Sequence, residues 1–300
     1  MHLLTLLPFL SLATAIPQSP PLQPFPIRAL TFNIRYAVSS PSPPEPAWSQ
    51  RLPPILSQLQ SVTTPNTFFS FQEVLHAQLV DLLSGLNGVT NPGSNGAPPI
   101  GPKWGYIGVA RDDGVRRGEY SPVIYPLTTF ELLRNETTWL SPTPDKPSKG
   151  WDAGSIRILT TGVFRHKETG RKVIVGSTHL DNAGERSRRE SIPIISAVLK
   201  RVAARYEVGA VVLGGDFNSR PDGEAYKLMA KEMKDLYTIV GDKKGGERTW
   251  TGFDGKGTGR IDFVWVGEGI KGEGYEVLEN AKGAVYFSDH KAVLGDLVVL

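Results

Sequence analysis

The segment VGAVVLGGDFNSRPDGEAY, residues 208–226, says most about the fold. Its first eight residues are apolar or glycine, which predicts a strand over 208–215 that is buried on both faces of a sheet. The polar side chains of Asp216 and Asn218 follow directly, and residues 222–233 predict a short helix. A buried strand that ends in polar side chains is typical of the sites that α/β proteins build at the edge of a sheet.

Strands and helices alternate on both sides of this segment. Period-two and short apolar runs predict strands over 27–34, 68–71, 106–110, 123–125, 156–164, 172–178, 261–266 and 292–299. Apolar residues at helical spacing predict helices over 48–59, 75–86 and 188–206. No change in composition and no repeat divides the chain, so we expect one α/β domain over 27–300. The order of its strands does not follow from the pattern.

The composition is that of a globular protein. Hydrophobic residues make up 40% of the 300-residue chain and charged residues 21%, which excludes a disordered tail, a collagen and a coiled coil. The net charge of +3 is too small to indicate a nucleic-acid partner. The chain has no cysteine, which excludes a disulfide scaffold, a thiol nucleophile and a Cys-ligated metal.

The amino terminus is typical of a secretory signal peptide. An apolar run over 3–12 precedes Ala13-Thr14-Ala15, which predicts a signal peptide over 1–15 and a Pro-rich lead-in over 16–26. A buried helix is the alternative for this run. No later stretch is long and apolar enough to span a membrane. We expect a secreted protein that is a monomer. The sequon at Asn135 is a potential glycan site.

Polar residues recur where the predicted strands end or begin. They are Asn33, Glu73, His179, Asp181, Asn182, Asp216, Asn218, Asp262, Ser288, Asp289 and His290. Each alone is more often a turn former than a ligand. Together, their carboxylates and amides suit Mg²⁺, and their two histidines suit acid–base chemistry.

A serine nucleophile is the competing interpretation of these residues. The chain has no G-x-S-x-G turn, and Ser288, Asp289 and His290 are adjacent, so their side chains point to alternate faces of a strand. It also has neither an H-E-x-x-H zinc motif nor a Walker A loop. A metal-assisted phosphoester chemistry is therefore favoured.

The order of these motifs resembles that of the endonuclease/exonuclease/phosphatase family, which includes deoxyribonuclease I, abasic-site endonucleases, neutral sphingomyelinases and inositol polyphosphate 5-phosphatases. The matching motifs are NIRY (33–36), FQEV (71–74), GEYSPVIY (118–125), STHLDN (177–182), GGDFNSRPDGEAY (214–226), GRIDFVWV (259–266) and FSDHKAV (287–293). The resemblance runs from about Ala29 to Leu297. Within the family, the chain resembles a secreted fungal and bacterial branch. It implies a four-layer α/β sandwich, with two mixed sheets face to face, helices outside and the site in a cleft at one edge.

The resemblance also implies roles for the polar residues. Glu73, Asn33 and Asp289 would hold or orient Mg²⁺, with Mn²⁺ as a substitute. Asp216 would orient or deprotonate the attacking water, and Asn218 would position the phosphate. His290, paired with Asp262, would contact the scissile phosphate, and His179 would be the candidate acid for the leaving oxygen.

Substrate contacts are predicted in the motifs that flank these residues. We expect them from Tyr120, Trp151, Arg157 and Asn182. Arg111 and the other arginines over 111–117 and 186–189 alternate with acids, which favours solvated faces. Trp104 and the pair Tyr286-Phe287 are expected in the core rather than on a membrane-binding hairpin.

Three functions remain open from the sequence. The first is a secreted Mg²⁺-dependent phosphoesterase that cleaves phosphodiesters in nucleic acid or in a small molecule. The second is a phospholipid or sphingomyelin phosphodiesterase. The third is a catalytically silent binding protein on the same fold. The motifs of inositol 5-phosphatases are incomplete here, which disfavours that activity.

Overall fold

The computed structural model describes residues 23–89, 96–283 and 285–300. The predicted signal peptide over 1–15 and most of the lead-in over 16–26 lie outside the described residues. The strand predicted over 27–34 is β1 (Phe25–Asn33), so the last two residues of the lead-in belong to this strand.

Seven strands form the first sheet. In spatial order they are β10 (Lys243–Lys244), β12 (Ile270–Val277), β15 (Val293–Val299), β1, β2 (Thr67–Gln72), β4 (Val123–Pro126) and β3 (Trp104–Ile107). β1 runs parallel to β2 and antiparallel to β15. The sheet is therefore mixed, and the end of β1 and the start of β15 lie at the same edge.

Six strands form the second sheet. In spatial order they are β5 (Phe130–Trp139), β6 (Ile158–His166), β7 (Lys172–His179), β8 (Val211–Asp216), β11 (Asp262–Val266) and β9 (Lys234–Asp235). β8 runs parallel to β7 and antiparallel to β11. β13 (Ala281–Lys282) and β14 (Val285–Tyr286) form a separate hairpin.

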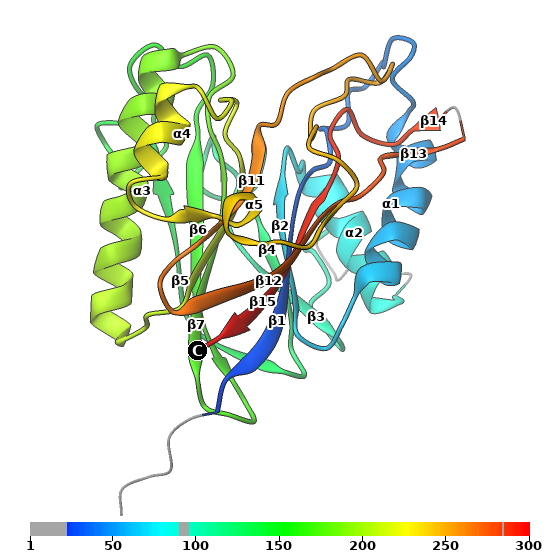
Figure 1. Cartoon of the computed structure of the whole chain (residues 1–300). Coiled ribbons are helices and arrows are strands. Elements are labelled where there is room, and N and C mark those ends of the chain that lie inside the picture. The colour runs from blue at the N-terminus through cyan, green and yellow to red at the C-terminus, as the bar shows by residue number, and fades with distance from the viewer. Residues whose placement is uncertain (1–22, 90–95, 284) are drawn as a thin grey trace, which may run out of the picture.

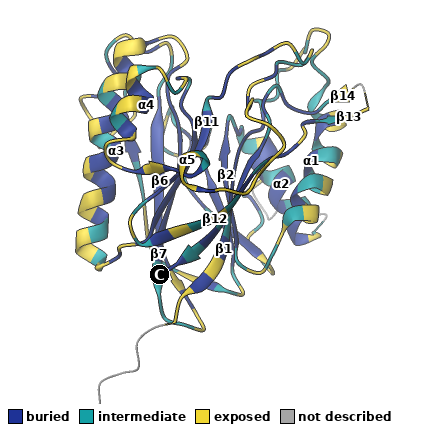
Figure 2. Ribbon diagram, viewed as in Figure 1, coloured by how far each residue is buried: buried dark blue, intermediate teal, exposed yellow. Residues whose placement is uncertain are grey.

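The helices lie outside the two sheets, which confirms the four-layer α/β sandwich (Figure 1). α1 (Trp48–Val62) and α2 (His76–Asn87) cover the seven-stranded sheet. α3 (Glu185–Tyr206) and α4 (Glu224–Met229) cover the six-stranded sheet, and α5 (Leu236–Ile239) is a single turn. The central strands of both sheets are almost wholly buried, whereas the helices expose their outer faces (Figure 2).

The alternation of side chains along β1 explains why the core has two parts. Ile27 and Ala29 belong to the cluster between the sheets, whereas Leu30 and Phe32 belong to the cluster under α1 and α2. Successive side chains of a strand point to opposite faces, so one strand supplies both clusters. Burial of this apolar surface on both faces is the main force that holds the layers together.

Two long strands and some boundaries differ from the sequence-based prediction. β5 is an edge strand whose middle residues are exposed and polar, and β12 carries glycines and charged residues, so neither shows a clear apolar pattern. The helix predicted over 222–233 ends at Met229, and the central strand begins at Val211 rather than at residue 208.

Glycine allows the two sheets to approach closely beneath one end of the sandwich. A Cβ on Gly214 of β8 would lie 2.8 Å from Ser70 Cβ and 2.9 Å from Thr31 Cβ, both in the opposite sheet. Next to this contact, Ser70 Oγ donates to the Gly176 carbonyl across the gap, and Ser177 Oγ donates back to the Phe71 carbonyl. These bonds fix the distance between the sheets.

Gly214→Ala is therefore expected to destabilise the protein. The new methyl group would push apart strand atoms that cannot rotate away, at a cost of about 1–3 kcal/mol. Gly209→Ala is the matched control, because a Cβ at that position would have no other atom within 4 Å. Chemical denaturation would measure both variants, and equal stabilities would contradict this account of the sheet contact.

Candidate active site

Several strands bring polar side chains together at one end of the sandwich. Asp216 is the register partner of His179 on β7 and of Asp262 on β11. β1 ends at Asn33 in the facing sheet, and His290 precedes β15. A cavity of about 610 Å³ opens at this end of the sandwich, with Asn33 and Asp262 behind its wall. It is lined by Arg35, Tyr36, Glu73, Arg111, Glu119, Ser155, Arg157, His179, Asn182, Asp216, Asn218, Arg220, Trp250, Gly259, Ile261, Asp289 and His290.

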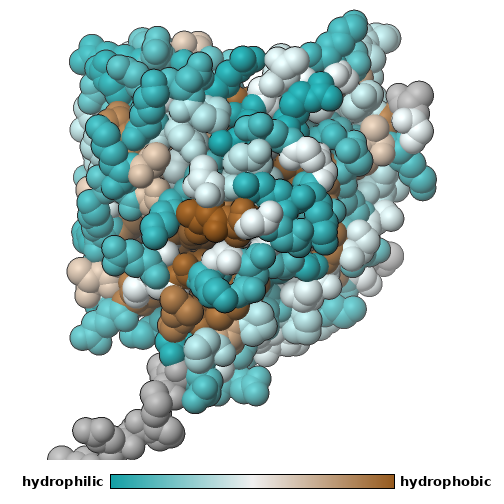
Figure 3. Space-filling model, viewed as in Figure 1, coloured by the Kyte–Doolittle hydropathy of each residue, from teal (hydrophilic) through white to brown (hydrophobic). Residues whose placement is uncertain are grey.

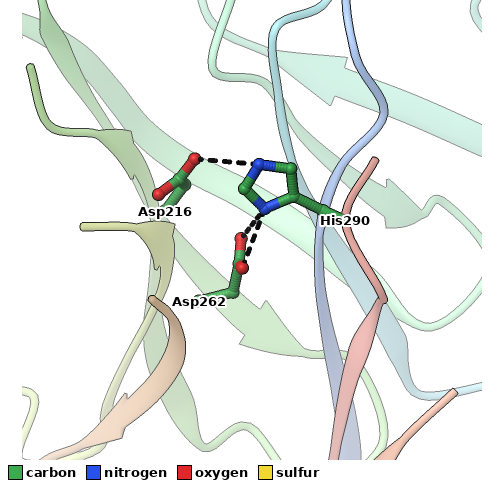
Figure 4. A group of neighbouring side chains, drawn as sticks. All are labelled: Asp216, Asp262 and His290. Carbon is green, nitrogen blue, oxygen red and sulfur yellow. Dashed lines mark hydrogen bonds and ion pairs between the residues drawn. The ribbon is translucent and has the colours of Figure 1, made fainter. Parts of the chain in front are cut away.

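His290 and Asp262 form a buried pair at the cavity wall (Figure 4). His290 Nδ1 lies 2.9 and 3.1 Å from the two carboxylate oxygens of Asp262, which is fully buried behind the ring. Burial would lower the pKa of His290, but the charges of Asp262 and Asp216 outweigh it and raise that pKa well above its usual range. The ring is therefore an imidazolium whose Nε2–H is directed toward Asp216, 3.7 Å away.

Asp216 lies at the centre of the site. Its carboxylate accepts from the Asn33 amide at 3.0 Å and from the Asn218 backbone N–H at 2.9 Å. Burial, followed by the charge of Asp262, raises the pKa of Asp216 to about 7. A carboxylate whose pKa lies near neutrality is suited to accept a proton from water at physiological pH.

The ring of His179 is neutral, whereas that of His290 is cationic. Burial, reinforced by the charges of Arg157 and Arg111, lowers the pKa of His179 well below its usual value. Its Nε2 accepts from the Asn218 amide at 3.0 Å, whereas its Nδ1 is buried without a hydrogen-bond partner. A neutral ring in this position holds Asn218 in place and is not a ready proton donor.

Glu73 and Asp289 make one end of the cavity rich in carboxylate oxygens. Glu73 accepts from the Asn33 amide at 3.0 Å and from the Tyr36 backbone N–H at 3.2 Å. One oxygen of Asp289 is buried with no hydrogen-bond partner. Carboxylate oxygens, one of them unsatisfied, fit a hard divalent cation such as Mg²⁺. We call this region the acidic end of the cavity.

Asn33 orients this end rather than facing into the cavity. Its Nδ2 donates to both Glu73 and Asp216, and its Oδ1 accepts from the Arg35 backbone N–H at 2.9 Å. All its polar atoms are engaged in a fully buried position. By its contacts, Asn33 therefore fixes the relative positions of two carboxylates.

Asp216, Asp262 and His290 are also close enough to share a metal ion, since their ligand atoms lie within 4.8 Å of one another. However, the Nδ1 of His290 is hydrogen-bonded to Asp262. This contact is better explained by an imidazolium–carboxylate pair than by a ring available to a metal. The acidic end is therefore the better metal site in the described part of the chain.

Arg51 of α1 holds the backbone around the acidic end. Its guanidinium is 1% exposed and donates to the carbonyls of Ile34, Tyr36 and Phe287. The first two follow Asn33, and the third precedes Asp289. One buried cation thus ties together the two loops that carry site residues from β1 and β15.

Arg157, Asn182 and Glu119 lie at the other end of the cavity. Arg157 Nη2 donates to Asn182 Oδ1 at 2.9 Å, and its Nε donates to Asp181 at 3.2 Å. Glu119 accepts from Arg111 at 2.8 Å and lies 3.9 Å from His179 Nδ1. Burial raises the pKa of Glu119 to about 6. Arg111 faces this end, although its charge run predicted a solvated surface.

Two of the predicted substrate contacts do not line the cavity. Tyr120 is 2% exposed, and its hydroxyl lies 2.9 Å from His76 Nδ1 and donates to the Val115 carbonyl. Trp151 is half-buried in a turn with a φ of 47°. These two predictions are wrong because the neighbouring residues, not these side chains, face the cavity or support its wall.

The other predicted residues come together as expected. Glu73, Arg157, His179, Asn182, Asp216, Asn218, Asp289 and His290 line the cavity, with Asn33 and Asp262 directly behind them. Sequence reasoning missed Arg35, Tyr36, Glu119, Arg220 and Trp250. Arg35 and Tyr36 follow Asn33 in the same motif, and Glu119 precedes Tyr120, so their positions carried a signal. Arg220 likewise lies in the motif over 214–226, whereas Trp250 carried no signal.

Asp181 supports the wall behind Arg157. It accepts from the backbone N–H groups of Gly154, Ser155 and Gly184 at 2.7–3.0 Å. Burial would raise the pKa of Asp181, but these bonds and the charge of Arg157 lower it to about 2.

Asp181→Asn is therefore expected to lower the free energy of unfolding at pH 7 by about 2 kcal/mol, because the native pKa of about 2 lies below the usual value of 3.8. Because the native pKa is depressed, this contribution is present above pH 4 and disappears as the pH falls toward 2. Denaturant titrations at pH 7 and pH 3 would test this. Asp296→Asn, which alters a half-exposed pair with Arg28, is the control and should cost less than about 1 kcal/mol. A pH-independent difference between Asp181→Asn and the native protein would contradict the assignment.

The four-layer sandwich, with its acidic and histidine side chains at one end, defines a deoxyribonuclease I-like protein. The model of the endonuclease/exonuclease/phosphatase family matches residues 30–290, and the chain belongs to this family. Members of the family hydrolyse phosphoesters. No curated protein sequence matched the chain.

Solved structures agree with this assignment. A family protein from Bacteroides thetaiotaomicron is 30% identical with a TM-score of 0.82, over 93% of this chain and 97% of that one. The mannosyl-6-phosphatase Bt3783 of the same organism is 29% identical with a TM-score of 0.79, over 90% and 99% of the two chains. The catalytic domain of human Nocturnin shares the fold at 18% identity and a TM-score of 0.63, over 91% and 94%.

Proposed function

We propose that the protein is a secreted, Mg²⁺-dependent phosphoesterase that hydrolyses a small phosphodiester by attack of water. One observation carries the proposal: Asp216 is held by two asparagines beside the His290–Asp262 pair, and the carboxylates of Glu73 and Asp289 lie in the same cavity. A base, a cation and a metal-binding end are the parts that phosphoester hydrolysis needs.

Each side chain has a role that follows from its charge state. Asp216 accepts the proton of the attacking water. His290, kept cationic by Asp262, donates its Nε2–H to a nonbridging phosphate oxygen and offsets the charge that develops there. The Asn218 amide, held against His179, donates to a second oxygen of the phosphate. When bound between Glu73 and Asp289, Mg²⁺ would polarise the phosphoryl group.

The size of the cavity favours a small substrate. A volume of about 610 Å³ is that of a small-molecule site. Of the arginines near 186–189, Arg189 pairs with Glu190 and Arg188 donates to the Asp181 carbonyl, so they do not form a free cationic track. A nucleic-acid strand remains the alternative substrate within the same class.

A sugar monophosphate is the second candidate, favoured by the similarity to the mannosyl-6-phosphatase Bt3783 over most of both chains. It differs from the first candidate in the charge of the ester. A monoester brings a dianionic phosphate, whereas a diester brings a single negative charge.

A membrane phosphodiesterase is less consistent with the surface. Trp104 and Phe287 are buried, as the sequence analysis expected, whereas Tyr286 is half-buried on the β13–β14 hairpin, so the expectation that it lies in the core is wrong. On the face shown in Figure 3, apolar side chains gather over α5, where Ile239 is 42% exposed, and the upper end of the sandwich is largely hydrophilic. None of the helices over the described residues could cross a bilayer.

Hydrolysis of a substrate panel with Mg²⁺, Mn²⁺ or EDTA tests the proposal. The panel contains bis(p-nitrophenyl) phosphate, p-nitrophenyl phosphate, a hexose 6-phosphate, plasmid DNA, RNA and sphingomyelin vesicles. EDTA-sensitive cleavage of the small diester is the expected result. Preferred cleavage of the monoesters selects the second candidate, and no cleavage of any member by folded protein supports a silent binding protein.

Secretion is tested by expression of the full chain in a host with a general secretory pathway. The expected product is found in the medium and begins at Ile16, because cleavage is predicted after Ala15. An intact amino terminus on protein retained inside the cell would overturn this part of the proposal.

A further inference from the structure

The outer side of β5 has no neighbouring strand in the described part of the chain. β5 is the first strand in the order of its sheet, and only β6 pairs with it. Residues 131–137 of β5 are exposed or partly exposed, whereas residues 138 and 139 are buried. The outward-facing N–H and C=O groups of an edge strand can pair with a second chain, so folded proteins protect their edges.

Two features protect the ends of β5 but not its middle. A bulge interrupts the register between Leu132 and Arg134, and the backbone N–H of Trp139 donates to the Pro144 carbonyl. The two acids of the strand are each neutralised by an arginine: Glu131 by Arg165, and Glu136 by Arg201. The segment 135–137 therefore has neither a bulge, nor a proline, nor an unpaired charge, which are the usual protections of an edge.

The glycosylation sequon of the chain occupies this same segment. Asn135-Glu136-Thr137 is the only Asn-x-Ser/Thr sequence in the 300 residues. Sequons of this type accept N-linked oligosaccharides, which are bulky and hydrophilic, when a chain passes through a eukaryotic secretory pathway. The one position that can accept a glycan is therefore at the one stretch of β5 that the protein itself leaves unprotected.

The fold leaves the Asn135 side chain free to carry such a group. The residue is exposed, and its amide makes no hydrogen bond within the described part of the chain. Its partner in the ladder is Gly162 of β6, which has no side chain to crowd the amide. By contrast, the amide N–H groups of the buried Asn33, Asn87 and Asn280 are all hydrogen-bonded. An oligosaccharide on Asn135 would therefore displace nothing in the folded protein.

We propose that Asn135 carries an N-linked oligosaccharide and that this glycan prevents β5 from pairing with the β5 strand of a second copy of the chain. The inference rests on the proposed secretion but not on the proposed hydrolysis, because no residue of β5 lines the cavity. In the transfer, the C1 carbon of the oligosaccharide moves from an oxygen of a lipid diphosphate to Asn135 Nδ2. A C–O bond breaks, a C–N bond forms, and Nδ2 loses one proton as the lipid diphosphate leaves.

The spacing of paired strands explains why a glycan would prevent this contact. Opposed side chains of two antiparallel strands lie only about 5 Å apart. If two β5 strands overlapped over 133–137, each oligosaccharide would have to fit within that distance of the other copy's side chains. A branched oligosaccharide does not fit there, so the glycosylated edge would remain unpaired.

Intact mass and peptide mapping of the full chain, secreted from a yeast host, test for the glycan. We expect an excess of mass that peptide N-glycosidase F removes, with conversion of Asn135 to an aspartate. Asn135→Gln and Thr137→Ala should each abolish the excess. Thr137→Ser, which keeps the hydroxyl that the sequon requires, is the matched control and should retain the excess. If the full chain stays inside the cell, the same proteins are made from residues 16–300 behind a leader of the host.

Sedimentation equilibrium tests the protection of the edge. Asn135→Gln removes the glycan and leaves the edge neutral, so we expect it to dimerise with a Kd at least about tenfold lower than that of the glycosylated protein. Asn135→Lys also removes the glycan but places a positive charge on the edge, as natural edge strands do, and should remain monomeric. Asn135 is exposed, so both variants are expected to fold.

The outcomes separate this inference from the proposed function. Secreted protein without a glycan on Asn135 would overturn the modification site while secretion itself stands. Glycosylation that occurs only behind the host leader would support the site and overturn the proposed secretion. Asn135→Gln that is as monomeric as the glycosylated protein would overturn the protective role, and so would Asn135→Lys that dimerises as tightly as Asn135→Gln, because the contact would then lie elsewhere.

Discussion

His290→Ala is expected to lower kcat/KM for the preferred phosphoester by about 10²–10³-fold, the range seen when a charge-stabilising donor is removed. His290 is the cation that faces Asp216, and its charge is maintained by Asp262. Alanine removes both the donor and the positive charge. Asp262 then loses its hydrogen-bond partner.

The fold is expected to survive this change. The backbone N–H of His290 donates to Ser288 Oγ, and neither this bond nor the contact of Ser288 with the Asn33 carbonyl depends on the imidazole. Thermal melting should therefore shift by only a few degrees. His166→Gln at the opposite end of the sandwich is the control and should keep native activity. More than a tenth of native kcat/KM in folded His290→Ala would rule out this role.

The pair also predicts non-additive effects. Asp262→Asn removes the charge that keeps His290 cationic, so it should lower activity almost as much as His290→Ala does. If the two residues act as a unit, the double variant should be little worse than either single variant. Additive losses would mean that Asp262 acts independently of the ring.

The site was predictable where it depends on the ends of strands. Asp216 follows an apolar run, and Asp262 and His290 border two others. Polar residues at strand ends indicate the edge of a sheet where sites form, but which of these residues meet depends on the order of the strands, which did not follow from the pattern. The structure places Asp262 directly opposite Asp216 in the ladder.

The direction of a side chain was less predictable than its position. The motif GEYSP was correctly associated with the cavity, but Glu119 lines it and Tyr120 points away. Adjacent residues in extended chain point to opposite faces, so an error of one residue exchanges a cavity residue for a core residue. Arg111 shows the same limit, because a charge run does not reveal which member turns inward.

Edge strands were the least predictable elements. β5 lies at the edge of its sheet, and β12 has only the two-residue β10 on one side, so both expose polar residues and lack a continuous apolar pattern. Arg51 was hidden for a different reason. It lies in a helix that was predicted from apolar spacing alone, and its contacts are to backbone carbonyls, which leave no trace in the sequence.

Glu73→Gln is expected to weaken Mg²⁺ binding at least 100-fold and to lower kcat/KM by about 10³-fold. The reason is that a whole negative charge is lost at the metal site, and each tenfold change corresponds to about 1.4 kcal/mol. Arg35 lies 3.7 Å from Glu73, and the buried Arg51 is also close. With the carboxylate replaced by an amide, the acidic end loses one carboxylate while both cations remain, so its potential becomes less negative. Asn33 and Tyr36 donate to different oxygens of Glu73, so the glutamine oxygen keeps one of these two bonds, and the fold should be retained.

Calorimetry of Mg²⁺ binding measures this effect without turnover. Glu119→Gln is the matched control, because it makes the same change beside Arg111 at the other end of the cavity and should leave the Mg²⁺ affinity unchanged. If Glu73→Gln binds Mg²⁺ as well as the native protein does, the metal lies elsewhere. The group of Asp216, Asp262 and His290 would then be the remaining candidate in the described chain, and Asp262→Asn should abolish binding. Loss of binding in Glu73→Gln alone would place the metal at the acidic end and leave His290 free to act as the cation on the phosphate.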